Sequence, residues 1–277
     1  MSSEILLYKR HIEDLRNIQN PYRIVEYSSR IIVTSNVDGA DIKREFVKNY
    51  YKTKGLHIVA MTYNSVSERI LSGEYVPKNT DTARIDPPNS FYNEDILLKM
   101  SSGEEIVAVD INSCYFNTLF QLGAISEKVY KSAFRKKSEY KDARNIAVGS
   151  LGRIGYITEY DGEKEMKGLE RRDTAVVRLD VIDTVYNRSL EIARALESDF
   201  LFFLTDCFFI RPSGLEKLKL LLDKHLYTYK TENIRLVGAE IVAREHFNVR
   251  WVKPDAVNES YVSFSRRNQY LHDLKNI

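Results

Sequence analysis

The sequence predicts an α+β fold in which an antiparallel sheet is covered by helices on one face, with a small α/β region at the N-terminus. Short, strongly apolar segments typical of buried strands lie between amphipathic segments typical of helices, and the two kinds do not follow a strict strand–helix–strand repeat. The 277 residues are 43% hydrophobic and 29% charged, with a net charge of +2. This composition is typical of a globular protein and excludes an intrinsically disordered chain.

Residues 1–92 are expected to form the N-terminal α/β region. An apolar stripe predicts a helix over 3–18, and Asp38-Gly39 predicts a turn. The other elements expected here are a hairpin or two short strands over 22–35, a helix over 41–53, a strand over 57–61 and a short helix over 63–72. Residues 74–92 carry three of the six prolines among polar residues, so we expect an irregular connection and a domain boundary there.

Residues 93–253 are expected to form a central domain, and 254–277 a tail. The expected strands lie at 106–111, 151–180, 200–204 and 207–210, with two more inside 234–253. The expected helices lie at 113–122, 126–149, 181–197 and 214–226, and Ser113 or Asn112 is a candidate cap for the first. Residues 261–277 are basic and aromatic, which fits either a solvated terminal helix or a contact with a phosphate backbone.

Several classes of protein are excluded by simple counts. No apolar run approaches the roughly 20 residues of a membrane-spanning helix, so we expect no membrane partner. The first residues, Met-Ser-Ser-Glu, lack the pattern of a secretory signal, and two cysteines make no disulfide framework. We therefore expect a cytoplasmic protein. The net charge alone does not indicate nucleic-acid binding, which has to be argued from local clusters.

Two aspartates end strongly apolar segments. Asp110 follows Ile106–Val109, and Asp206 follows the segment 200–205. A carboxylate at the edge of a buried strand is costly unless it is paired, hydrogen-bonded or bound to metal. Two such carboxylates on neighbouring strands would repel each other, and a pair of divalent cations would cancel this repulsion and form a site for phosphoryl transfer. The alternative is that each aspartate caps a helix or pairs with an arginine.

A basic segment lies between the two aspartates. Residues 128–144 contain seven lysines and arginines against two acids, and Lys137 precedes Lys141, Asn145 and Val148 on one predicted helical stripe. A basic helix that faces a two-carboxylate site can neutralise the oxygens of a triphosphate. The alternative is an ordinary solvated helix face.

Together these residues resemble a family B DNA polymerase. Three of the family's motifs occur in order. The pattern D-x-x-S-L-Y-P corresponds to Asp110-Ile-Asn-Ser113-Cys-Tyr115-Phe116, K-x-x-x-N-S-x-Y-G to Lys141-Asp-Ala-Arg-Asn145-Ile-Ala-Val148-Gly149, and Y-G-D-T-D-S to Phe202-Phe-Leu204-Thr205-Asp206-Cys207. The resemblance covers about residues 100–253 and implies a polymerase-type palm sheet, with stub fingers at about 125–140 and no recognisable exonuclease domain.

The resemblance implies a role for each matching residue. Asp110 and Asp206 would be the catalytic residues and would hold two Mg²⁺ or Mn²⁺ ions together with the carbonyl of Ile111. The nucleotide-binding residues would be Ile111, Asn112, Ser113, Tyr115, Lys137, Lys141, Asn145 and Thr205, with Tyr115 under the incoming sugar. On the late strands, Arg250, Trp251 and Lys253 would contact nucleic acid.

Two functions follow from the resemblance. The first is a minimal DNA polymerase, template-directed or template-independent, that adds deoxynucleoside triphosphates to the 3′-hydroxyl of a DNA primer. The second is a catalytically inactive palm that binds nucleic acid or scaffolds another polymerase or replication subunit. Leu204 in place of the first aspartate of the third motif, Val148 in place of a tyrosine and the short fingers favour the second. A split polymerase is a further alternative, and the small size indicates a virus or mobile element as the source.

Overall fold

The computed structural model describes residues 3–26, 30–47, 54–81, 88–136, 138–171, 173–243, 246–254 and 256–265. The chain forms two compact units, each built from two segments. Unit 1 comprises Met1–Arg84 and Gly123–Asp180, and unit 2 comprises Ile85–Leu122 and Val181–Ile277. The expected boundary at 74–92 contains one of the crossings between units. Residues 123–180, which we expected in the central domain, belong with the N-terminal segment instead.

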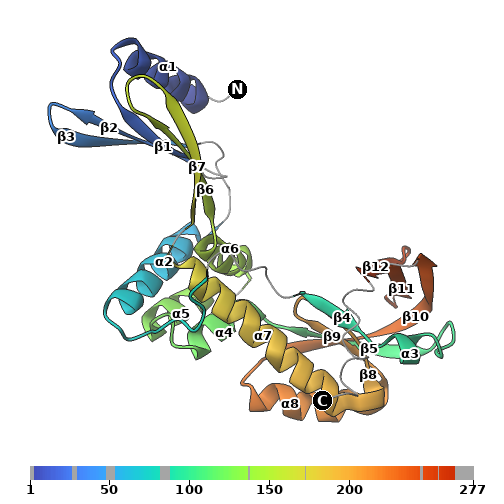
Figure 1. Cartoon of the computed structure of the whole chain (residues 1–277). Helices are drawn as coiled ribbons and strands as arrows, with labels where there is room; N and C mark the ends of the chain where they lie inside the picture. Colours follow the sequence, from blue (N-terminus) through green and yellow to red (C-terminus); the bar gives the residue numbers. More distant parts are fainter. Residues whose placement is uncertain are drawn as a thin grey trace. The chain divides into compact units, whose positions relative to one another are not determined.

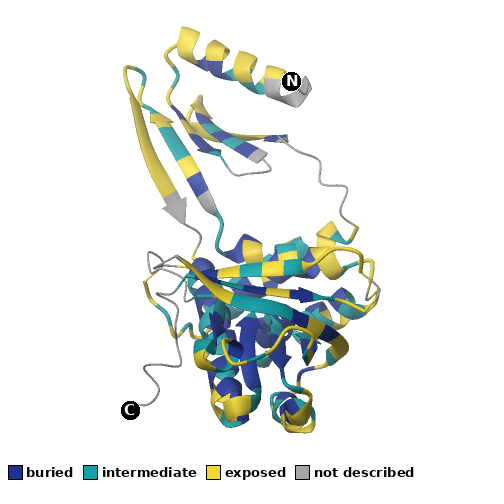
Figure 2. Ribbon diagram, turned by 90° about the vertical axis from the view of Figure 1, so that its right-hand side faces the viewer, coloured by how far each residue is buried: buried dark blue, intermediate teal, exposed yellow. Residues whose placement is uncertain are grey.

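Unit 1 contains an antiparallel sheet in the order β3-β2-β1-β6-β7 (Figure 1). Its strands are β1 (Tyr22–Glu26), β2 (Arg30–Val37), β3 (Ala40–Val47), β6 (Ile154–Tyr160) and β7 (Glu165–Arg171). Helix α1 (Ser3–Asn17) lies where the apolar stripe predicted it. Its buried residues Ile12 and Leu15 pack with Ile24, Val33 and Phe46 of the sheet, while most of its other described positions are exposed in Figure 2.

The helix expected over 41–53 is wrong where the structure describes it. Ala40–Val47 is a strand that pairs antiparallel with β2, and residues 48–53 lie outside the described residues. Asp38 and Gly39 have φ values of 52° and 83°. Two positive φ values in a two-residue loop match the twist of the flanking strands, so the turn directs the chain back along the sheet.

The strand expected over 57–61 is also wrong. Residues 57–61 and 63–72 belong to one helix, α2 (Leu56–Leu71). Its buried residues are Ile58, Thr62, Ser65 and Val66, which recur at helical spacing. A five-residue apolar run does not by itself separate a strand from part of a buried helix.

Unit 1 also contains a helical part. Helix α2 contacts α5 (Glu127–Phe134) and α6 (Lys141–Leu151), which form where one or two basic helices were expected over 126–149. Helix α7 (Ala175–Leu196) begins in this unit, and its first turns belong to the segment 151–180 where we expected only strands. The buried carboxylate of Asp180 accepts hydrogen bonds from the Tyr75 hydroxyl (2.5 Å) and the Asn79 amide (2.8 Å). This anchors the segment after α2 to α7.

Within the described residues, unit 2 contains a seven-stranded antiparallel sheet in the order β12-β11-β10-β5-β9-β8-β4. The strands are β4 (Ser90–Tyr92), β5 (Glu105–Ile111), β8 (Phe200–Leu204), β9 (Cys207–Ile210), β10 (Tyr229–Ala243), β11 (His246–Val252) and β12 (Ser260–Ser265). The terminal helix considered for 261–277 is wrong for residues 261–265, which belong to β12. Residues 266–277 lie outside the described residues.

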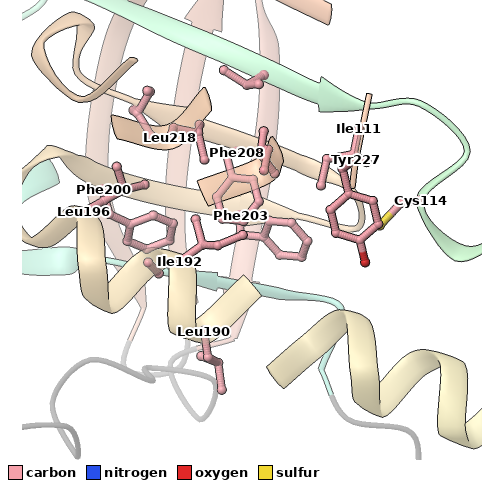
Figure 3. Packing of buried hydrophobic residues seen from close by; sticks show 14 of the residues in the cluster. Ile111, Cys114, Leu190, Ile192, Leu196, Phe200, Phe203, Phe208, Leu218 and Tyr227 are labelled. Carbon is pink, nitrogen blue, oxygen red and sulfur yellow. The ribbon is translucent and has the colours of Figure 1, made fainter. Parts of the chain in front are cut away.

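One face of this sheet is covered by helices. Side chains from β5, β8 and β9 pack there with α4 (Cys114–Gln121), the second half of α7 and α8 (Leu215–Lys224), and Figure 3 shows Phe200, Phe203 and Phe208 in this cluster. Strand β8 is apolar on both faces because it is buried on both. A register shift between Phe200 and Phe202 puts Phe200 and Phe203 on the helix side.

The opposite face is enclosed by the sheet itself. Phe202, Phe209 and Trp251 pack together there, with ring centroids 4.0 to 5.7 Å apart, and the short helix α3 (Glu94–Leu97) adds Leu97. The two edge strands approach each other, because Tyr92 of β4 stacks on Phe264 of β12 at 4.6 Å. The α+β expectation is thus confirmed, with helices on one face and a curled sheet around the other.

Candidate active site

Asp206 lies in a two-residue turn between β8 and β9. Leu204 and Cys207 pair across the hairpin, so Thr205 and Asp206 form its tip. Thr205 has a φ of 55°, which is strained for a β-branched residue, and its amide donates to the carbonyl of Asn89 at 2.6 Å. Strain of this kind persists only where the surroundings fix it, and it concentrates at functional sites.

Asp110 lies at the end of β5, next to this turn. Its cross-strand partner is Cys207, and the following amide, of Ile111, donates a hydrogen bond of 2.9 Å to the carbonyl oxygen of Asp206. Two residues that are 96 positions apart in the sequence are therefore neighbours across one strand pair. The structure brings Asp110, Ile111, Thr205 and Asp206 together, as a shared site requires.

The pKa values of two nearby cysteine thiols are raised by the charges of Asp110 and Asp206 as well as by burial. Burial, and then the negative charges of Asp110 and Asp206, raise the pKa of the Cys207 thiol to about 12. Burial and then the charge of Asp206 also raise the pKa of the Cys114 thiol. In Figure 3 Cys114 lies beside Tyr227, within the helix-side cluster. Both carboxylates thus act on the same small region, and both cysteines are neutral structural residues there.

The segment after Asp110 turns sharply into α4. The Asn112 amide donates to the carbonyl of Thr228 (2.8 Å), and the Asn117 side chain donates to the carbonyl of Asn112 (2.7 Å). Ser113 is the N-cap with a φ of 49°, and its side chain makes no capping hydrogen bond, so the expected cap interaction is not formed. The Tyr115 hydroxyl donates to the carbonyl of Thr205 at 2.9 Å.

A cavity of about 560 Å³ extends from Asp110 across the enclosed face of the sheet. Its charged lining residues are Asp110, Lys230, Glu232 and Lys253, and Lys253 pairs with Glu232 at 2.6 Å. Lys230 is the cross-strand partner of Asp110. Lys230 is not among the residues predicted from the sequence, because only the register of β10 against β5 shows that it faces the same cavity.

The late-strand residues predicted to contact nucleic acid are separated by strand alternation. Lys253 lines the cavity, and Trp251, only 8% exposed, forms part of its wall while packing against Phe209. Arg250 points to the other face of β11, where it pairs with Glu259 at 3.4 Å. Arg250 therefore does not share a surface with the other two.

The second motif belongs to unit 1. Lys141 and Asn145 are exposed on α6, whereas Val148 is buried, so it does not share their exposed face. Arg144 is also buried: it donates to the carbonyl of Ala133 at 2.9 Å, and burial lowers the pKa of its guanidinium. Lys137 lies outside the described residues. A role for Lys141 and Asn145 beside the two aspartates stays a prediction.

The two carboxylates fit a hard divalent cation whose remaining ligands come from the substrate. Among the described residues, no three side chains of His, Cys, Asp or Glu gather into a metal-binding group. Mg²⁺ is usually held by one or two carboxylates together with substrate phosphates, and as a hard ion it prefers oxygen ligands to the sulfur of Cys207. Asp110 and Asp206 therefore suit such an ion, and the carbonyl of Ile111 is the third predicted ligand.

Comparison with known proteins gives no assignment: no family model matches the chain, and none of the curated proteins matches its sequence. Within the part of the chain that the structure describes, every helix is too short or too polar to cross a membrane.

Proposed function

We propose that this chain is a nucleotidyltransferase of the family B DNA polymerase type, which adds deoxynucleotides to a 3′-hydroxyl on a DNA primer with the help of two Mg²⁺ or Mn²⁺ ions. The observation that carries the proposal is the hydrogen bond between the Ile111 amide and the Asp206 carbonyl. It joins the two strand ends that bear the motif aspartates. Asp110 also lines the cavity, so a substrate bound there would reach this carboxylate.

Each residue has a distinct task in this proposal. Asp110 and Asp206 hold the cations, which when bound supply the positive charge that favours ionisation of the hydroxyl and departure of pyrophosphate. The strained turn at Thr205 and its hydrogen bond to Tyr115 fix the direction of the Asp206 backbone. Fixed ligands lower the cost of reorganisation during the reaction.

The triphosphate and sugar contacts come from the motif resemblance. Lys141 and Asn145, both exposed on α6, would contact the triphosphate and the nucleotide. The ring of Tyr115 would lie under the sugar and exclude a 2′-hydroxyl. Because α6 is part of an insertion between two segments of unit 2, its position in the chain matches fingers that are inserted into a palm.

The direct test is extension of a labelled primer, with and without template, by the parent and by Asp110→Asn and Asp206→Asn. Each change removes a negative charge and leaves the shape, so we expect a loss of about 10²–10³-fold or more. Asp223→Asn, an exposed aspartate on α8, is the matched control and should keep parent activity. If either motif variant extends primers as the parent does while retaining its fold, the proposal is wrong.

The alternative is an inactive palm that serves as a binding or scaffolding subunit. The observation that favours it is Leu204, which packs beside the aromatic core at the position of a motif aspartate. Melting temperatures separate the two functions. A catalytic palm should be stabilised by Mg²⁺ with a deoxynucleoside triphosphate, because a ligand that binds only the folded state raises its stability. No rise at millimolar Mg²⁺ would favour the scaffold.

A further inference from the structure

The cavity beside Asp110 has an apolar floor and a charged rim. Strand alternation puts Ala108, Phe209, Ile234 and Trp251 on the same face of the sheet as Asp110, and these four form the apolar part of the lining. Besides Asp110, the charged side chains are those of Lys230 and Glu232 on β10 and of Lys253 directly after β11. The cavity therefore suits a ligand with one flat apolar part and one charged part.

The floor is rigid and aromatic. Trp251 and Phe209 have ring centroids 5.2 Å apart, and both are almost fully buried by neighbouring rings. Their remaining exposed surface faces the cavity. Because the two ring planes are inclined by 57°, a planar ring can lie flat against one of them and meet the other with its edge. Every nucleobase has a planar face to offer.

The rim favours an anion. Lys253 is neutralised by Glu232, whereas Lys230 makes no ion pair with any residue that the structure describes. With Asp110 assigned to the cations, the remaining charged lining residues are two lysines and one glutamate, which leaves one positive charge in excess. That charge lies at Lys230, next to the end of β5. A ligand with a phosphate group beside its planar part would pair this phosphate with the positive charge of Lys230.

The size of the cavity limits the ligand. Pockets of about 300–1,000 Å³ enclose one drug-sized molecule, and this one measures about 560 Å³. The curl of the sheet, which brings Tyr92 of β4 against Phe264 of β12, encloses the same face. One nucleotide unit matches this space.

We infer that this cavity binds a single nucleotide unit, with its base against Trp251 and Phe209 and its phosphate at Lys230, and that this unit is the acceptor whose 3′-hydroxyl is extended. The acceptor role rests on the proposed function, but the binding does not. A free mononucleotide and the terminal unit of a single strand present the same chemistry, and the experiment separates them.

Binding is measured by titration calorimetry with deoxyadenosine 5′-monophosphate, deoxyribose 5-phosphate and the single-stranded trideoxyadenylate. The monophosphate should bind, and the sugar phosphate, which lacks the base, should bind at least about tenfold more weakly. Lys230→Gln should weaken binding about tenfold or more, as loss of one charge-assisted hydrogen bond predicts. Lys217→Gln on α8, exposed and outside the cavity, is the matched control.

A second variant fills the space. Ser260→Trp puts a large side chain into the cavity lining, opposite Trp251 across the strand pair, and should abolish binding. Circular dichroism checks its fold, and if it does not fold, the Lys230→Gln result decides. Tighter binding of the trinucleotide identifies a strand end as the source, and tighter binding of the monophosphate identifies a free nucleotide. Absence of binding by both overturns the inference, as does equal binding to Lys230→Gln.

Primer extension by the same variants separates this inference from the proposed function. If the monophosphate binds as expected but neither the parent nor any variant transfers nucleotides, the cavity binds a nucleotide and the polymerase proposal is wrong. If the parent extends primers and both Lys230→Gln and folded Ser260→Trp do so equally well, the polymerase proposal holds and the cavity is not the acceptor site.

Discussion

The hydroxyl of Tyr115 donates a hydrogen bond of 2.9 Å to the carbonyl oxygen of Thr205. This single contact joins the helix that follows Asp110 to the turn that presents Asp206. The same two motif segments are also joined by the Ile111 amide and by the cross-strand pair of Asp110 and Cys207. Their mutual geometry is therefore a property of the fold and exists before any substrate arrives.

Removing the hydroxyl tests this tie. Tyr115→Phe keeps the ring and should lower the free energy of unfolding by about 0.5–1.5 kcal/mol, the usual contribution of one hydrogen bond. Urea unfolding measures the change. Tyr261→Phe, at a tyrosine that is 72% exposed, is the control and should change little. Equal stability of the two variants would show that the hydrogen bond contributes nothing in solution.

The left-handed backbone of Thr205 predicts an inverted preference between alanine and glycine. Alanine normally stabilises a chain relative to glycine, but at a φ of 55° only glycine is free of steric strain. Thr205→Gly should therefore be more stable than Thr205→Ala by about 1 kcal/mol. Thermal or urea unfolding of both variants measures the difference, and the usual order, with alanine ahead, would contradict the conformation.

Cys207 predicts a loss of stability at alkaline pH. Its pKa is about 12 in the folded chain against 9.0 for an ordinary thiol. As the pH rises past the ordinary value, the unfolded chain loses this proton first, so the stability falls between these two pKa values and is full below them. Between pH 8 and 10, Cys207→Ala should lose about 1 kcal/mol less than the parent in urea unfolding. If the stability of the parent and of Cys207→Ala falls by the same amount between pH 8 and 10, the thiol does not cause the loss.

Gly55 predicts a steric requirement at the start of α2. Its φ is 82°, and a Cβ atom there would lie 2.5 Å from Cδ1 of Tyr140. Gly55→Ala should lower the free energy of unfolding by about 1–3 kcal/mol, from both backbone strain and the clash. Gly73→Ala is the control, because its φ is 74° but its Cβ would meet no atom within 4 Å. A loss no larger than that of the control would mean that Tyr140 yields easily.

Secondary structure was predicted correctly from the sequence where one local pattern was much stronger than the others. The Phe-rich segment before Asp206 is short and rich in aromatic residues, which favours a strand buried on both faces, and the structure has β8 there. The segment after Asp38-Gly39 shows the opposite case. Its many charged residues favour a helix, but the two-residue turn before it is a strong hairpin signal, and the structure has strand β3 there.

The site was predictable only in part, for a similar reason. Asp110 and Asp206 could be found from their places at strand ends, but the cross-strand register that brings Lys230 beside Asp110 is a property of non-local pairing. The same holds for Trp251. Its place with Arg250 and Lys253 on a late strand indicated a nucleic-acid contact by resemblance, and only the packing of Phe202 and Phe209 shows that it is mostly enclosed.

The interleaving of the two units has a consequence for synthesis of the chain. Strand β1 needs β6 as its neighbour, and β5 needs β9 and β10, so neither sheet is complete when its first segment leaves the ribosome. Strand β5 must wait for β9, which is encoded almost a hundred residues later. Nascent chains that stall before residue 154 would expose unpaired edges, and such intermediates are prone to aggregate and are natural clients of chaperones.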